Sequence, residues 1–217
     1  MTGPNFLIAG APKCGTSTLY HWLRARPDIY LPHASGDAYW RHKEPCFFCP
    51  DIVEGPSRVE SEEYDAIFAP GAEYSLRGEA TPFYLISDVA ADLIYEANPS
   101  TKIILCLRHP AEFILSQWRD SLYWGHDEEL NFEKAIDPDR PLADLPARCW
   151  YPKACRYRHV AEFSTYLSRF TNRFPAHQIH YVWLKDMKTD PERCFADVLS
   201  FLGAAPVEGK ADLSAHN

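Results

Sequence analysis

Short apolar runs alternate with segments of helical spacing along this chain. Five short segments are predicted to be strands, at residues 6–9, 29–31, 77–82, 102–107 and 178–184, of which 77–82 is polar and ends at a proline. Apolar residues recur every three or four positions in the segments between and after them, at residues 18–23, 89–97, 110–122, 160–170 and 191–202. An alternation of strands and helices is typical of a parallel sheet. We therefore predict an α/β fold of three layers, with a central parallel sheet and helices on both faces.

Three segments show no such pattern. Residues 33–41 are polar and are predicted to be a loop, and residues 51–76 are acidic and rich in turn-forming residues. Residues 125–155 are proline-rich and irregular, although Trp150 and Tyr151 indicate at least partial order. A loop of this length in a compact domain usually has a function or lacks order.

A loop of small residues joins the first strand to the first helix. Gly10 and Gly15 are separated by four residues, as in a nucleotide-binding P-loop, but Lys13 precedes the second glycine and Thr16 and Ser17 follow it. The free N–H groups and the positive dipole end of a helix N-terminus bind phosphate-like anions. The sequence thus predicts a P-loop-like anion site with its cation in the middle of the loop. The alternative is an ordinary turn with an incidental lysine.

A second cation is expected at the same edge of the sheet. Arg108 follows the most apolar strand, and Pro110 suits the first turn of the next helix, in which Ser116 lies about two turns further on. Because ligands of open α/β sheets bind at the carboxyl ends of strands, Arg108 and Ser116 predict a site for a second anionic group. A magnesium-dependent kinase or ATPase would have an aspartate there, which disfavours that class. A surface ion pair is the other interpretation of Arg108.

Two acidic residues are candidate bases. Glu44 lies in the segment Lys43-Glu44-Pro45-Cys46-Phe47-Phe48, in which Pro45 keeps it extended and the two phenylalanines can anchor it in a core. A carboxyl group held beside buried aromatic rings can have its pKa tuned. A solvated pair of Lys43 and Glu44 at a strand edge is the alternative. Glu79, on a short strand before a proline, is the rival acid.

Composition narrows the possible partners. The chain has 217 residues, 46% of them hydrophobic, which is enough for one globular domain, and its net charge of −8 gives no basic field for nucleic acid. No run of 18 apolar residues predicts a membrane span, and no signal peptide precedes the first strand. The seven cysteines include two pairs, Cys46 with Cys49 and Cys149 with Cys155, which could form two small bridges or bind one zinc ion together.

Four segments in order resemble one enzyme family. Residues 12–18 are similar to the 5′-phosphosulfate loop of sulfotransferases, and Leu107-Arg108-His109-Pro110 with Ser116 resembles their 3′-phosphate motif. Residues 43–48 resemble a glutamate-containing segment of the Golgi carbohydrate sulfotransferases, of the heparan sulfate and chondroitin types. Residues 78–84 are similar to a further segment of the same enzymes.

The resemblance implies an enzyme that moves a sulfuryl group from 3′-phosphoadenosine 5′-phosphosulfate (PAPS) to a hydroxyl, or an amine, of a carbohydrate, expected to be a polysaccharide. It implies catalytic roles for Lys13, as the stabiliser of the leaving group, and for Glu44, as the base, without a metal. Lys43 and Glu79 are secondary candidates for acceptor contacts. The residues implied to bind the donor are Lys13, Cys14, Gly15, Thr16, Ser17, Thr18, Arg108 and Ser116.

The sequence departs from the family pattern at Ala80, where many relatives have a lysine, and at His109, where they have Asp or Asn. Relatives also continue beyond Gly203 with a basic loop, so we expect residues 1–217 to be a single sulfotransferase domain truncated at its C-terminus. The family implies the Golgi lumen, and the cytoplasm is the alternative because no targeting segment is seen. Two other functions stay open, a P-loop nucleotide kinase or NTPase and an inactive nucleotide- or glycan-binding domain.

Overall fold

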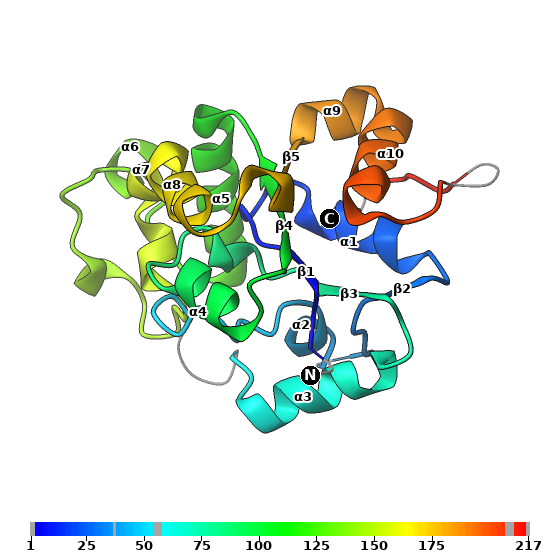
Figure 1. Ribbon diagram of the computed structural model, residues 1–217. Helices are drawn as coiled ribbons and strands as arrows, with labels where there is room; N and C mark the ends of the chain where they lie inside the picture. Colours follow the sequence, from blue (N-terminus) through cyan, green and yellow to red (C-terminus); the bar gives the residue numbers. More distant parts are fainter. Residues whose placement is uncertain (1–2, 37, 54–57, 207–210, 216–217) are drawn as a thin grey trace.

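Five parallel strands form the centre of the computed structural model, which describes residues 3–36, 38–53, 58–206 and 211–215 (Figure 1). Their order within these residues is β2-β3-β1-β4-β5. The strands are β1 (Phe6–Ile8), β2 (Ile29–Tyr30), β3 (Leu76–Glu79), β4 (Lys102–Leu107) and β5 (Ile179–Trp183). Leu7 of β1 lies opposite Ile103 of β4 on one side and Glu79 of β3 on the other. The middle strand β1 is fully buried, as its apolar sequence predicts.

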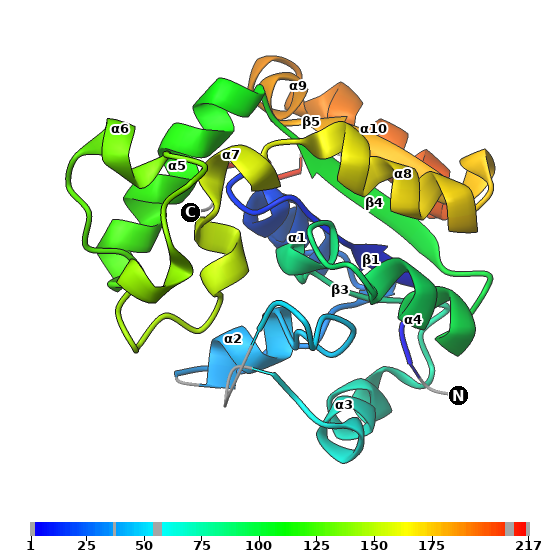
Figure 2. The ribbon, with the colours of Figure 1, turned by 90° about the vertical axis from the view of Figure 1, so that its left-hand side faces the viewer.

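Helices cover both faces of this sheet, which confirms the three layers. On one face lie α1 (Thr16–Arg24), α9 (Leu184–Thr189) and α10 (Pro191–Leu202), at the right of Figure 1, where Trp22 of α1 meets Phe195 of α10 edge to face at 5.7 Å. The opposite face carries α4 (Ala90–Ala97), α5 (Pro110–Trp124), α7 (Tyr157–Val160) and α8 (Phe163–Arg173), seen from outside in Figure 2. Phe113 of α5 packs on Phe163 of α8 with ring centres 5.1 Å apart.

Shorter elements complete the described structure. Two helices, α2 (Ala38–Lys43) and α3 (Ser61–Phe68), lie below the sheet in Figure 1, and α6 (Phe132–Ala135) lies beside α5 in Figure 2. Single 3₁₀ turns occur at Ala69–Gly71, Pro82–Tyr84, Leu142–Asp144, Pro152–Cys155 and Ala176–Gln178. No helix among the described residues is both long and apolar enough to cross a membrane.

The sequence-based prediction of a loop over residues 33–41 is wrong at its end, where α2 begins. Six residues are too few to show a helical period, and contacts elsewhere in the fold hold this helix. The Tyr39 hydroxyl lies 3.1 Å from Nε2 of His21, and its ring packs against His33. The irregular character of residues 125–155 is confirmed, since only α6 and two 3₁₀ turns interrupt it.

All seven cysteines are free thiols, so neither of the two bridges that the sequence left possible is formed. The shared zinc site is also not formed, because Cys46 and Cys49 belong to the main core whereas Cys155 belongs to a separate cluster with Tyr157, against which Cys149 packs. Within the described residues, no three His, Cys, Asp or Glu side chains gather as metal ligands.

Candidate functional site

The loop between β1 and α1 owes its shape to two glycines with positive φ angles. Gly10 has φ 138°, and a Cβ atom there would lie 2.5 Å from the carbonyl oxygen of Pro82. Gly15 has φ 91° at the N-cap of α1, and a Cβ atom there would lie 2.8 Å from Sδ of Met187 in α9. Any side chain at either position would therefore clash, and glycine also tolerates these angles without strain. No side chain caps the N-terminus of α1.

Lys13 connects this loop to α5. Its backbone is in the left-handed region, with φ 57°, and its Nζ atom lies 2.7 Å from Oδ1 of Asp120. Both side chains of this ion pair are partly exposed, at 36% and 26%. The carbonyl oxygen of Lys13 accepts a hydrogen bond from Nη1 of Arg108 at 3.4 Å. The two cations predicted at the sheet edge are therefore neighbours, although 95 residues separate them in sequence.

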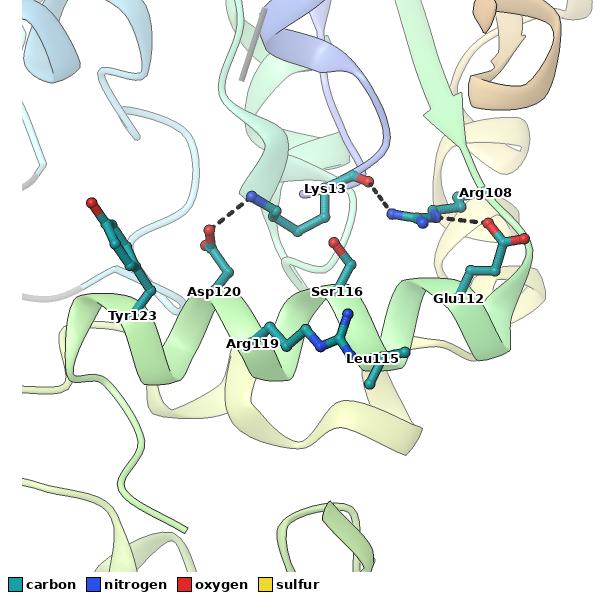
Figure 3. Close-up of a pocket in the computed structure, with 8 residues that line it drawn as sticks. All are labelled: Lys13, Arg108, Glu112, Leu115, Ser116, Arg119, Asp120 and Tyr123. Carbon is teal, nitrogen blue, oxygen red and sulfur yellow. Dashed lines mark hydrogen bonds and ion pairs between the residues drawn. The ribbon is translucent and has the colours of Figure 1, made fainter. Parts of the chain in front are cut away.

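A pocket of about 360 Å³ lies between the loop and α5 (Figure 3). Its volume falls within the usual range of small-molecule sites, roughly 300–1,000 Å³. The hydroxyl of Ser116 points from α5 toward Lys13 in Figure 3. The lining residues are Lys13, Arg108, Glu112, Leu115, Ser116, Arg119, Asp120 and Tyr123. The structure thus brings together three of the predicted site residues, Lys13, Arg108 and Ser116.

The structure shows the surface ion pair of Arg108, whereas its role in an anion site stays a prediction. Its Nε atom donates to Oε2 of Glu112 at 3.0 Å, which is an ion pair of i, i+4 spacing at the surface. The guanidinium group also lines the pocket and bonds the carbonyl oxygen of Lys13. Since Glu112 is 63% exposed, this pair contributes little to stability and can yield to a stronger anion.

Glu44 is held beside the loop by a buried lysine. The side chain of Lys43 is fully buried, and its ammonium group donates to Oγ of Ser17 at 2.9 Å and pairs with Glu44. It also lies 4.8 Å from the ring centre of Trp40, which adds a cation–π contact. The prediction of a solvated pair at a strand edge is wrong, because α2 ends at Lys43 and turns that side chain inward. Glu44 itself remains 16% exposed.

Glu79 is enclosed by hydrogen-bond donors. Its carboxylate accepts bonds from the Tyr84 hydroxyl at 2.5 Å, the Thr81 N–H at 2.9 Å and the Tyr64 hydroxyl at 3.3 Å. The side chain is fully buried, and burial raises its pKa to about 7 against the opposing effect of these bonds. The geometry therefore favours a structural role for Glu79 at the end of β3 over contact with an acceptor. The N–H of the next residue, Ala80, donates to the carbonyl oxygen of Lys43.

The remaining loop residues divide between the core and the site. Cys14 is fully buried, and burial raises the pKa of its thiol to about 12, so its side chain packs in the core. Thr16 and Thr18 are also buried, at 4% and 8% exposure, whereas Ser17 holds Lys43. Sequence reasoning could not separate these hydroxyls, since it had only their order.

Sequence reasoning missed Asp120 and Tyr151. Asp120 follows Ser116 by four residues and Arg108 by twelve, so helical spacing alone could have placed it on the same face. Tyr151 packs on His126 and Phe83, with ring centres 4.2 Å and 4.8 Å apart. Burial raises the pKa of Tyr151, and the charge of Asp120 acts in the same direction.

These features define a P-loop-like α/β protein in which Lys13 and Arg108 line one pocket at an edge of the sheet. The chain belongs to the sulfotransferase domain family, whose model matches residues 3–217. The family predicted from the loop motifs is thereby confirmed, and the alternative of a nucleotide kinase or NTPase is not supported.

Several known proteins are similar to this chain. A membrane-associated sulfotransferase, kil1, of Dictyostelium discoideum is 32% identical over 153 residues, 67% of this chain and 29% of the relative. The bifunctional heparan sulfate N-deacetylase/N-sulfotransferase 2 of Bos taurus is 26% identical over 94% of this chain and 22% of its own length. Carbohydrate sulfotransferase 15 of Rattus norvegicus is 24% identical over 96% of this chain and 45% of its own length. The chain thus spans less than half of each of these relatives.

Among solved structures, a sulfotransferase from Alicyclobacillus acidocaldarius has a TM-score of 0.81 and 27% identity, and the match covers 99% of this chain and 86% of that chain. A sulfotransferase domain from the curacin biosynthetic pathway has a TM-score of 0.61 and 12% identity, over 95% of this chain and 75% of that chain. These likenesses confirm the predicted fold class.

Proposed function

We propose that this chain transfers a sulfuryl group from PAPS to a hydroxyl, or an amine, of a carbohydrate. The observation that supports this most is the pocket in which Lys13 and Arg108 meet, with the hydroxyl of Ser116 on its α5 wall. PAPS has an anionic group at each end of its ribose, the 5′-phosphosulfate and the 3′-phosphate. Two cations from different elements suit such a donor better than one would.

The donor set of the site fits this compound. We assign the phosphosulfate to the N-terminus of α1 and Lys13, since a helix N-terminus with a nearby ammonium group binds such an anion. We assign the 3′-phosphate to Arg108 and Ser116. Membership of the sulfotransferase family supports the choice of donor. The same fold occurs in a mouse sulfotransferase complexed with PAP, the product without the sulfuryl group, at a TM-score of 0.51 and 13% identity.

The chemistry assigns a separate task to each residue. PAPS supplies the electrophilic sulfur, and PAP leaves as the acceptor oxygen takes its place. Lys13 stabilises the negative charge that develops on the oxygen between sulfur and the 5′-phosphate. Glu44 accepts the proton of the acceptor hydroxyl, so that a sulfate ester and a protonated carboxyl result. Lys43 positions Glu44 and connects it to the loop through Ser17.

A carbohydrate acceptor, expected to be a polysaccharide, is supported by the relatives, whose names refer to heparan sulfate and to carbohydrate. Location in the Golgi lumen stays a prediction, and one relative is named as membrane-associated. Microscopy of the tagged gene product in its own cell tests the location, and a diffuse cytoplasmic signal would contradict it.

Calorimetry and a transfer assay test the function. We expect the protein to bind PAP and not ATP with magnesium, and to move labelled sulfate from PAPS to an unsulfated polysaccharide. The double variant Lys13→Ala and Arg108→Ala should lose PAP binding, whereas Lys134→Ala, which removes an exposed cation of α6, should keep it. Binding of PAP without transfer to any glycan or small alcohol would indicate the inactive binding domain instead.

A further inference from the structure

Two thiols meet beside the C-terminal half of α5. The Sγ atoms of Cys149 and Cys155 lie 3.8 Å apart, and Sγ of Cys155 also lies 3.8 Å from Oγ of Ser121. A disulfide needs the two sulfurs at about 2.05 Å, so a shift of less than 2 Å would join them. Cys149 lies in an irregular stretch between two 3₁₀ turns, outside any helix or strand.

The two thiols differ chemically. Cys149 is partly exposed, and its pKa is lowered to about 5, first by the hydrogen bond from Cys155 and then by the His126 side chain and the Tyr151 N–H. Cys155 is 5% exposed, and its hydrogen bond to Cys149 together with burial raises its pKa. One sulfur is therefore an accessible thiolate, and its neighbour is a protected thiol. This is the arrangement of an attacking and a resolving cysteine.

His126 lies beside the pair. Its ring is 8% exposed, and its Nδ1 atom is buried without a hydrogen-bonded partner among the described residues. The carbonyl oxygen of the same residue lies 3.9 Å from Sγ of Cys155. His126 thus contacts Cys155 through its backbone, and its side chain contributes to the lowered pKa of Cys149.

Cys46 and Cys49 provide an internal contrast. They are also close, since Sγ of Cys49 donates to the carbonyl oxygen of Cys46 at 3.6 Å, but both are buried in the main core. The pKa of Cys46 is raised, first by its bond with Cys49 and then by burial. Burial also raises the pKa of Cys14, Cys106 and Cys194. Proximity alone therefore does not produce a reactive pair in this chain.

We propose that Cys149 and Cys155 are a redox-active dithiol, which a low-molecular-weight disulfide such as glutathione disulfide oxidises reversibly. The Cys149 thiolate attacks one sulfur of glutathione disulfide, whose S–S bond breaks and releases one glutathione. Cys155 then loses its proton to water and attacks the Cys149 sulfur, and the second glutathione leaves as a thiolate and takes up a proton from water. Two thiols are oxidised to one disulfide, and one glutathione disulfide is reduced to two glutathione molecules.

The position of the pair connects it to the pocket, and this part of the inference rests on the proposed function. Tyr151 lies between the two cysteines in sequence, and its ring packs on His126, the residue whose carbonyl oxygen contacts Cys155. Ser121, which contacts Cys155, directly follows Asp120, the partner of Lys13. A disulfide would restrain the segment that carries Tyr151, so oxidation should change PAP affinity by several-fold.

Mass spectrometry of the full chain after treatment with glutathione disulfide tests the site. We expect a Cys149–Cys155 disulfide in the parent, one glutathione on Cys149 in Cys155→Ser, and no glutathione on Cys155 in Cys149→Ser. Cys49→Ser is the matched control and should react as the parent does. If Cys155→Ser carries no glutathione on Cys149, or if glutathione spreads evenly over the cysteines, the proposal is overturned.

The pH dependence of alkylation tests the thiolate without relying on a variant. Between pH 6 and pH 8 the alkylation rate of Cys149 should rise less than about threefold, whereas that of an ordinary thiol rises roughly 50- to 100-fold. A rise of the ordinary size would overturn the assignment of Cys149 as the attacking group.

Calorimetry with PAP on the reduced and oxidised parent tests the link to the pocket. The affinity should differ between the two forms of the parent but not in the double variant Cys149→Ser and Cys155→Ser. Equal affinities of the two parent forms would overturn the link, while the redox site would stand on its mass data. Failure of both forms to bind PAP would overturn the proposed function and the link with it.

Discussion

Replacing Asp120 with asparagine should strengthen binding of the donor nucleotide. In the structure the Asp120 carboxylate holds the ammonium group of Lys13 at 2.7 Å. A phosphosulfate that binds Lys13 must compete with this carboxylate and also approaches its negative charge. Asp120→Asn keeps the size of the side chain, removes the charge and leaves Lys13 in place.

The size of the effect follows from two contributions. A partly exposed ion pair such as this one, with side chains 36% and 26% exposed, is worth about 0.2–1 kcal/mol. Repulsion between two unit charges about 4 Å apart costs about 1 kcal/mol in water. Together they give about 1–2 kcal/mol, which corresponds to roughly 5- to 30-fold tighter binding. The gain should shrink as salt is raised, because both contributions are screened.

Titration calorimetry with PAP at low and moderate salt measures this change. The matched control is Asp92→Asn, which removes one negative charge from the ion pair between Asp92 of α4 and Arg173 of α8. This variant should leave PAP affinity unchanged. Unchanged affinity in Asp120→Asn would refute the competition. Weaker binding would show that Asp120 positions Lys13 for the donor instead.

Four further predictions concern the other site residues. Lys13→Ala should lower turnover by about 10²–10³ while PAP affinity falls less, and equal losses would make Lys13 a plain binding residue. Arg108→Ala should bind PAP and adenosine 5′-phosphate with similar affinity in calorimetry, and a preserved preference for PAP would place the 3′-phosphate elsewhere. Glu44→Gln should keep PAP affinity and lose about 10²–10⁴ in transfer rate, and near-normal transfer would remove it as the base. Burial raises the pKa of Glu79 to about 7, so the folded state keeps a proton that the unfolded state releases, and the free energy of unfolding should fall from about pH 4.5 to pH 7, by up to about 1.4 kcal/mol per pH unit. Urea unfolding of Glu79→Gln should not show this fall, and an equal fall in both proteins would contradict the assignment.

The sequence by itself determined the layers of the fold and the position of the anion loop. Buried parallel strands are near-continuous apolar runs, so Phe6–Ile8 and Lys102–Leu107 were recognisable without any knowledge of their partners. Gly10 and Gly15 were identified by spacing, and the structure gives the reason, which is close approach by Pro82 and Met187. Such local patterns are visible because they depend on neighbours in the chain.

Only the tertiary structure decided how the candidate residues are used. Glu44 and Glu79 looked alike in sequence, each before a proline, but one is partly exposed beside the loop and the other is fully buried among hydroxyl groups. Lys13 meets Asp120 across 107 residues, and the pKa of Cys149 is lowered, first by its hydrogen bond with Cys155, whereas that of Cys46 is raised. Charge, exposure and pKa depend on which groups the folded chain brings into contact, and spacing along the sequence does not contain that information.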